Sequence, residues 1–263
     1  KIAKDLLQEN DFRAEAGRIE KLVGLAKTAG MIPNNSRSLV EANEDQLAIL
    51  AKHHDVFEAD DDEASIIEHS LQVLAASCEK MDVIDFDDQL LLSFASNAPV
   101  DTYDYVFVDE SQDLSVLQHE LVARSLGPKS RLCMVGDEHQ ACMAFRGADA
   151  DSMTTMANRF ECERLPLHVS YRCPQDVVRE AQQYVGHIKA HHSAPRGHVD
   201  FNPRSLESLS PQPGDMMVCR ASAPTVRAAY ACLRSGIPAV VIGRDIGSGL
   251  KTLIKKLNAA SVG

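Results

Sequence analysis

The chain has 263 residues, 44% hydrophobic and 25% charged, which suffices for a sizeable core and favours two domains over one. No apolar run approaches the roughly 20 residues that span a membrane, and the sequence does not open on a signal peptide, so a cytoplasmic protein without membrane contact is expected. Its seven cysteines form no CxxC pair, which predicts reduced thiols and argues against zinc or iron–sulfur binding.

The formal net charge of −11 is unfavourable for binding a phosphate backbone, because such binding needs Lys and Arg. Much of the acidic excess lies in two early runs, residues 41–45 and 58–63. Charge runs of this kind are usually solvated faces or loops. The net charge therefore does not exclude a nucleic-acid partner for the later part of the chain.

Residues 1–97 are predicted to be helical. Apolar side chains recur at helical spacing between 12 and 26 and again between 66 and 78, with a loop at 31–36. A third helix is predicted over 86–94.

From residue 105 strands alternate with helices. A short buried strand over 105–108 precedes a helix over 116–126, whose Ser115 and Gln118 fit a capping box. A turn at 127–130 then leads into a strand over 131–137. This order is typical of a parallel sheet covered by helices, so we predict the α/β class.

A second α/β block begins near residue 165. It is predicted to hold helices over 175–185 and 224–234 and a surface loop over 202–214. The predicted strands of this block cover 198–201, 216–219 and 239–242.

The sequence DESQD, residues 109–113, places two carboxylates, Asp109 and Glu110, where the first strand of the sheet ends. Open α/β sheets bind ligands at that edge. One carboxylate can hold Mg²⁺ while its neighbour orients and deprotonates a water molecule. A solvated acidic turn is the simpler alternative.

The next strand ends in VGDEHQACMAFRGAD, residues 135–149. Its Asp137 and Gln140 are expected beside the acidic pair, because parallel strands present their ends side by side. Met143, Phe145 and Arg146 offer apolar surface beside a cation, which suits stacking on unpaired bases. Alternatively, Met143 and Phe145 belong to the core.

A third segment, LPLHVSYRCP at residues 165–174, contains Tyr171 and Arg172. A Tyr can stack on adenine, and an Arg from a second domain can neutralise charge on a γ-phosphate. An ordinary surface Arg is the alternative. His187, His191 and His192 place two imidazoles at helical spacing that could bind a metal, but no third ligand is evident, so a solvated helix end is the better interpretation.

In order and separation these three segments resemble motifs II, III and IV of the UvrD/Rep family of superfamily 1 DNA helicases. IDFDDQLL at residues 84–91 is similar to the segment that precedes motif II in the family, and residues 218–247 to its second RecA-like domain. The resemblance implies parts of two RecA-like parallel-sheet domains. We expect a helical region at 1–97, part of the first motor domain at 98–164 and part of the second at 165–263.

The resemblance also implies roles. Asp109 would coordinate Mg²⁺, Glu110 would activate water, and Gln140 would couple the γ-phosphate of ATP to the DNA track. Tyr171 would stack near the adenine, and Arg172 would act from the second domain. Phe145 would stack on single-stranded DNA with Arg146 as the cation beside it. Met143 stands where relatives usually have a Tyr, which weakens one stacking platform. Asp137 is expected at the nucleotide because its strand ends beside the strand of Asp109.

The implied function is ATP-driven movement on single-stranded DNA, 3′ to 5′, with unwinding at duplex junctions. The family also needs a phosphate-binding loop before motif II, and none precedes residue 103; GRDIGSGLKT at 243–252 lacks the required GK[ST]. We therefore expect little ATP hydrolysis from this chain by itself. The alternatives are a non-catalytic helicase-like module that binds DNA or protein, and another magnesium-dependent phosphoryl-transfer enzyme.

Overall fold

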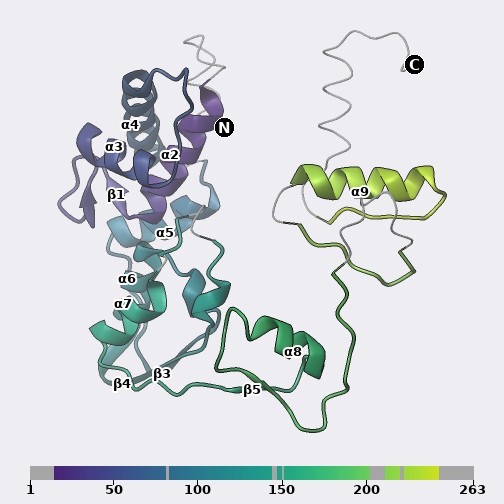
Figure 1. Ribbon diagram of the computed structural model, residues 1–263. Helices are drawn as coiled ribbons and strands as arrows, with labels where there is room; N and C mark the ends of the chain where they lie inside the picture. Colours follow the sequence, from purple (N-terminus) through teal and green to yellow (C-terminus); the bar gives the residue numbers. More distant parts are fainter. Residues whose placement is uncertain are drawn as a thin grey trace, which may run out of the picture. The chain divides into compact units, whose positions relative to one another are not determined.

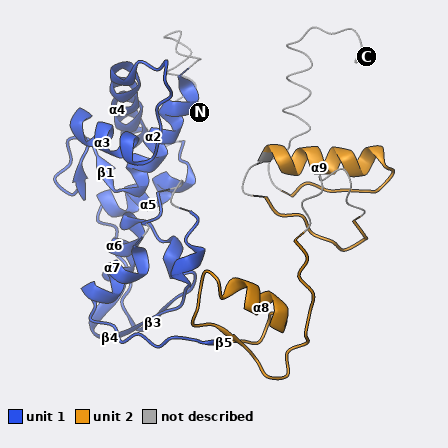
Figure 2. Cartoon of the chain, viewed as in Figure 1, with its two compact units in different colours: residues 1–168 blue, residues 169–263 orange. Residues whose placement is uncertain are grey.

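The computed structural model describes residues 15–80, 83–143, 147–149, 151–201, 211–219 and 222–242. The chain divides into two compact units, residues 1–168 and 169–263, shown in Figure 2. Each unit is described by itself below. In the described part of the chain, no helix is both long and apolar enough to cross a membrane.

The first part of unit 1 is a helical bundle, labelled in Figure 1. The sequence predicted three of its helices, at their approximate positions, and missed α3. Each helix except α2 begins at an Asn or Asp whose side chain accepts a backbone N–H, which satisfies an otherwise unpaired donor. The helices are α2 (Ala16–Thr28), α3 (Glu44–His53), α4 (Glu63–Glu79) and α5 (Phe86–Ala95).

The core of unit 1 lies within this bundle. Ile19, Leu22, Leu47, Ile66 and Leu74 are all fully buried. They come from three helices, and the apolar spacing found in the sequence marks the buried faces of two of them, α2 and α4. The predicted loop at 31–36 begins instead with a short strand, β1 (Met31–Ile32), which pairs in parallel with β2 (Val40–Glu41).

A buried ion pair joins α2 to α5. Lys27 is 3% exposed, and its Nζ lies 2.7 Å from Oδ1 of Asp88 and 2.8 Å from Oδ2 of Asp85. Ser77 adds a hydrogen bond to Oδ1 of Asp88 at 3.0 Å. Burial opposes the charge of Lys27, but the hydrogen bonds to both carboxylates outweigh burial and raise the pKa of the ammonium group.

Replacing Lys27 by Met should lower the free energy of unfolding by about 3–5 kcal/mol, because the substitution leaves Asp88 buried without its counter-ion. Urea denaturation at pH 7 measures this loss. Lys21→Met is the matched control: Lys21 lies exposed on the same helix and donates only to the carbonyls of His54 and Asp55, so its loss should be near 1 kcal/mol. Equal losses would contradict the role assigned to the ion pair.

The second part of unit 1 is a βαβ arrangement. β3 (Tyr103–Val108) leads through the short helix η1 (Ser111–Asp113) to α6 (Val116–Arg124), and the chain returns as β4 (Leu126–Met134), parallel to β3. The predicted capping box of Ser115 and Gln118 is present at the start of α6. Two further helices follow, η2 (Glu138–Gln140) and α7 (Ser152–Arg159). The α/β class is confirmed.

Two local predictions for this part were wrong. Residues 127–130 are not a turn before the strand; they form an irregularity within β4, where the pairing shifts between Tyr103↔Leu126 and Tyr105↔Arg131. The hydroxyl of Ser130, which accepts from the Gly127 N–H at 2.7 Å, holds this irregularity together.

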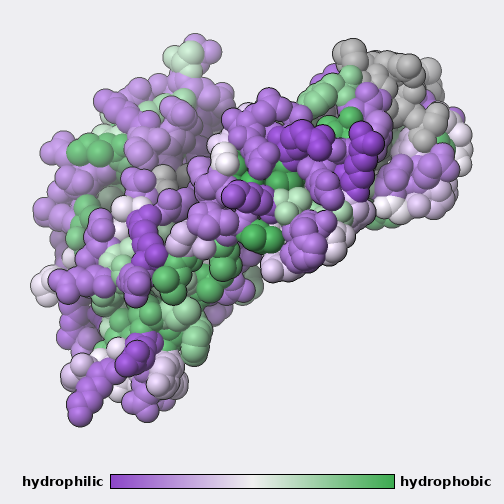
Figure 3. Space-filling view, turned by 60° about the horizontal axis from the view of Figure 1, so that its bottom comes forward, coloured by the Kyte–Doolittle hydropathy of each residue, from purple (hydrophilic) through white to green (hydrophobic). Residues whose placement is uncertain are grey.

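β3 is also not buried on both faces. Tyr103, Tyr105 and Phe107 alternate along the strand and are each more than half exposed, whereas Val106 and Val108 are partly covered. β3 pairs only with β4 in the described residues, so one face of the strand stays open. In Figure 3 apolar surface gathers at the end of unit 1 that carries these strands.

Unit 2 contains β5 (Val169–Ser170), α8 (Gln175–Ala181), β6 (Lys189–Ala190) and α9 (Ser222–Arg234), with β5 and β6 paired in parallel. The two predicted helices are present, α8 in shortened form. The three predicted strands are not formed: residues 198–201, 216–219 and 239–242 have no ladder partner in the described part of the unit. An apolar run becomes a strand only where a neighbour takes its backbone hydrogen bonds.

Candidate functional site

The carboxyl ends of β3 and β4 are joined where the acidic pair begins. The N–H of Val135 donates to the carbonyl of Val108 at 2.8 Å, and the N–H of Ser111 donates to the carbonyl of Val135 at 3.0 Å. Asp109 and Glu110, both exposed, lie between these two links. The residues that follow each strand are therefore held at one edge.

The backbone of Glu110 is left-handed, with φ 49° and ψ 41°. This region costs a non-glycine residue about 1–3 kcal/mol and persists only where the surroundings fix it. Two hydrogen bonds do so here. The N–H of Glu110 donates to Oδ1 of Asp109 at 3.0 Å, and Oε2 of Glu110 accepts from Nε2 of Gln112 at 2.7 Å.

Gln112 connects the two strand ends. Its side chain is buried, and while Nε2 donates to Glu110, Oε1 accepts the N–H of Asp137 at 3.0 Å. Oδ2 of Asp137 in turn accepts from Nε2 of Gln140 at 2.7 Å. Glu110, Gln112, Asp137 and Gln140 thus form one continuous chain of hydrogen bonds. The role of Gln112 was missed in the sequence, although the residue lies inside DESQD, because only its amide geometry reveals it.

Gly136 has no side chain, which lets the side chain of Gln112 lie directly against the backbone that follows β4. A Cβ at this position would lie 2.5 Å from Oε1 of Gln112 and 2.9 Å from both Oγ of Ser111 and Sδ of Met153. All three distances are below normal contact. Any larger residue must therefore displace the side chain that links the strand ends.

The donor set fits a magnesium–nucleotide site. Oδ2 of Asp109 and Oε1 of Glu110 make no hydrogen bond within the described residues, so two carboxylate oxygens are available at the edge. The described residues contain no group of three or more His, Cys, Asp or Glu placed to hold a metal. Mg²⁺ usually takes one or two carboxylates plus phosphate oxygens and water, and the edge offers that number.

The segment predicted to contact DNA is described only in part. Met143 is partly buried, and Phe145 and Arg146 lie outside the described residues. Gly147, just after them, has φ +85°, and a Cβ on it would lie 2.0 Å from Oγ1 of Thr28. The backbone that follows the segment is therefore packed directly against α2.

Tyr171 and Arg172 belong to unit 2. The predicted site residues that the structure brings together at the β3–β4 edge all belong to unit 1. Tyr171 is 78% exposed, and its ring centroid lies 4.5 Å from that of His191. Arg172 is exposed and makes no ion pair within the described residues. His191 follows β6 and is not on a helix, which corrects the helix-end interpretation of this His cluster.

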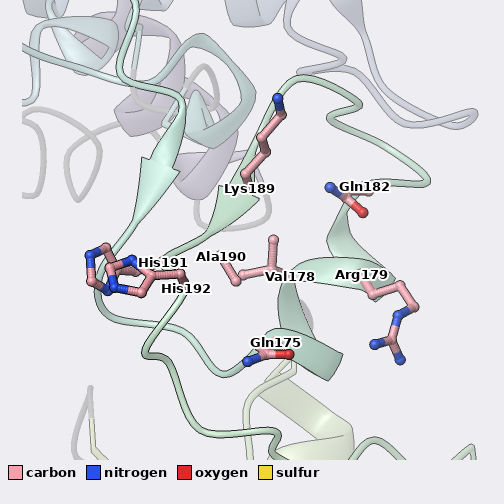
Figure 4. Close-up of a pocket in the computed structure, with 8 residues that line it drawn as sticks. All are labelled: Gln175, Val178, Arg179, Gln182, Lys189, Ala190, His191 and His192. Atoms are coloured by element: carbon pink, nitrogen blue, oxygen red, sulfur yellow. The ribbon is translucent and has the colours of Figure 1, made fainter.

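A concavity of about 310 Å³ lies between α8 and β6. Figure 4 shows that the side chains of Lys189 and Arg179 point away from one another, so the two cations do not converge on one point. Arg179 is moreover paired with Asp176 at 2.6 Å. The cations of this concavity therefore do not form one binding point, whereas the polar side chains at the edge of the sheet in unit 1 are joined by hydrogen bonds.

The sequence profile of the UvrD/REP helicase N-terminal domain matches residues 1–161, more than half of the chain. The chain belongs to the UvrD/REP helicase family. Similar proteins include a probable DNA helicase II homolog of Mycoplasma pneumoniae, 28% identical over 109 residues, which are 40% of this chain. The ATP-dependent DNA helicases PcrA of Staphylococcus epidermidis and Rep of Escherichia coli are 29% and 31% identical over 86 and 78 residues, 32% and 29% of the chain.

These matches cover 12–15% of the relatives' own length. The matched segments therefore correspond to a small part of each relative. The residues at the β3–β4 edge lie within the part that the family profile matches.

Replacing Gly136 by Ala should lower the free energy of unfolding by about 1–3 kcal/mol, because the new methyl group overlaps Gln112, Ser111 and Met153. Gly127→Ala is the matched control within β4, since a Cβ there meets nothing closer than 3.6 Å. Denaturant unfolding of both variants measures the difference. Equal stabilities would show that the packing around Gly136 is not tight.

Proposed function

We propose that the edge formed by β3 and β4 is the metal- and water-binding half of the ATPase site of a DNA helicase. In the intact protein, ATP hydrolysis at this edge drives movement along single-stranded DNA, 3′ to 5′, and separation of the duplex at junctions. The observation that carries the proposal is the continuous hydrogen-bonded chain from Glu110 through Gln112 and Asp137 to Gln140.

In this proposal Asp109 holds Mg²⁺ through Oδ2, and the ion when bound neutralises charge on the phosphates. Glu110 uses its unoccupied Oε1 to orient the attacking water and accept its proton. Gln112 holds the other oxygen of Glu110 and so keeps the carboxylate from turning away. The exposed position of both acids leaves room for a nucleotide.

Gln140 and Asp137 occupy the end of the second strand and would sense the terminal phosphate of ATP. The segment that leads from them to Met143, Phe145 and Arg146 would carry this signal to single-stranded DNA. The packing of Gly147 against α2 supports the idea, because it fixes the far end of that segment.

Tyr171 and Arg172 would complete the site from the second motor domain. The exposed ring of Tyr171 suits stacking on adenine, and Arg172 would neutralise charge on the γ-phosphate. We assign residues 1–97 to a helical accessory region, 98–164 to the first RecA-like domain and 165–263 to the second.

Glu110→Gln in the full-length protein should lower DNA-stimulated ATP turnover by about 10²- to 10⁴-fold, because an amide cannot accept the proton of the attacking water. Steady-state phosphate release measures it, and unwinding of a tailed duplex should fall in parallel. Glu138→Gln is the control: Glu138 lies at the same edge but pairs with Arg164 at 3.1 Å, so turnover should stay near wild type. A Glu110→Gln protein that still turns over ATP normally would refute the assignment.

A further inference from the structure

A second polar network lies behind the catalytic edge and is almost completely buried. It joins His119 on α6, Ser152 at the first position of α7, and the backbone of Ser111 in η1. His119 and Ser152 are 3% and 1% exposed. Nε2 of His119 lies 2.8 Å from Oγ of Ser152, which lies 2.7 Å from the carbonyl oxygen of Ser111.

The chemistry of the three groups fixes the direction of both hydrogen bonds. A carbonyl oxygen can only accept, so the single hydroxyl proton of Ser152 is donated to Ser111. The proton between Ser152 and His119 must therefore come from Nε2 of the ring. Burial lowers the pKa of His119 and so favours the neutral ring, and the hydrogen bond to Ser152 places the ring proton on Nε2.

This network controls the peptide that follows Glu110. The N–H and the hydroxyl of Ser111 both donate to the carbonyl of Val135 at 3.0 Å, and its carbonyl is held from the opposite side by Ser152. Both ends of the residue are thus fixed. The peptide bond between Ser111 and Gln112 sets the backbone position from which the Gln112 side chain extends. The amide at the end of that side chain holds the carboxylate of Glu110.

We propose that Ser152 and His119 are positioning residues for ATP hydrolysis, which keep Glu110 in its left-handed conformation by anchoring the carbonyl of Ser111. The proposal rests on the proposed function, in which Glu110 activates water. Neither residue contacts the reacting atoms; His119 orients Ser152, and Ser152 orients the turn. Their effect should therefore fall on the rate of the chemical step and not on nucleotide affinity.

The test uses the full-length protein. Ser152→Ala should lower kcat for DNA-stimulated ATP hydrolysis by about 10- to 100-fold, an effect of the size seen when a residue that orients a functional side chain is lost, with the KM for ATP unchanged. Ser77→Ala is the matched control, because Ser77 is equally buried and loses one hydroxyl hydrogen bond, to Asp88. It should lose stability but retain kcat.

A second pair of variants covers the case in which Ser152→Ala does not fold. His119→Gln keeps a side-chain N–H that can donate to Ser152, whereas His119→Leu does not. We expect kcat to be near wild type for Gln and reduced for Leu. Equal kcat for these two variants, a fall in kcat for Ser77→Ala as large as for Ser152→Ala, or a change confined to KM would overturn the proposal.

Glu110→Gln distinguishes a failure of the positioning role from a failure of the proposed function. If that variant is inactive while Ser152→Ala and His119→Leu retain wild-type kcat, the positioning role is wrong and the proposed function stands. If Glu110→Gln retains full turnover, the proposed function is wrong, and the positioning role of Ser152 and His119 is wrong with it.

Discussion

The amide of Gln112 is the interaction on which the rest of the edge depends. A single planar group donates to the carboxylate of Glu110 and accepts from the backbone of Asp137, and so joins the residues that follow two different strands. A carboxylate in its place could not donate and would repel Glu110, and an aliphatic side chain would leave the N–H of Asp137 without its side-chain acceptor. Few other side chains satisfy both partners at once.

The helical bundle contacts the segment that follows this edge. The ion pair of Lys27 with Asp88 joins α2 to α5, and α2 also receives Gly147 at close range. The segment between Gln140 and Gly147 is therefore tied to the sheet edge at one end and to the bundle at the other. Under the proposed function, these two attachments are the route by which contact with DNA would act on the ATP site.

Sequence patterns predicted the bundle and the meeting of the strand ends, because apolar spacing and strand order are local or topological properties. They did not predict the left-handed Glu110 or the contacts of Gln112. The pairing of His119 with Ser152 joins residues 33 positions apart and leaves no local pattern. The same limit explains the errors: residues 127–130 have turn composition but lie within β4, and the apolar runs of unit 2 lacked partner strands.

The charge pattern also bears on Arg172. In a chain with a formal net charge of −11, carboxylates are abundant, and four arginines of the later region, Arg159, Arg164, Arg179 and Arg196, each pair with Asp or Glu, whereas the exposed Arg227 and Arg234 on α9 form no ion pair within the described residues. Arg172 makes no such pair within the described residues, although Asp176 lies only four positions further along the chain. Under the proposed function, an exposed guanidinium that no carboxylate holds is available to an anionic ligand such as a γ-phosphate, and the position of Arg172 directly after Tyr171, not the missing ion pair alone, distinguishes it from Arg227 and Arg234.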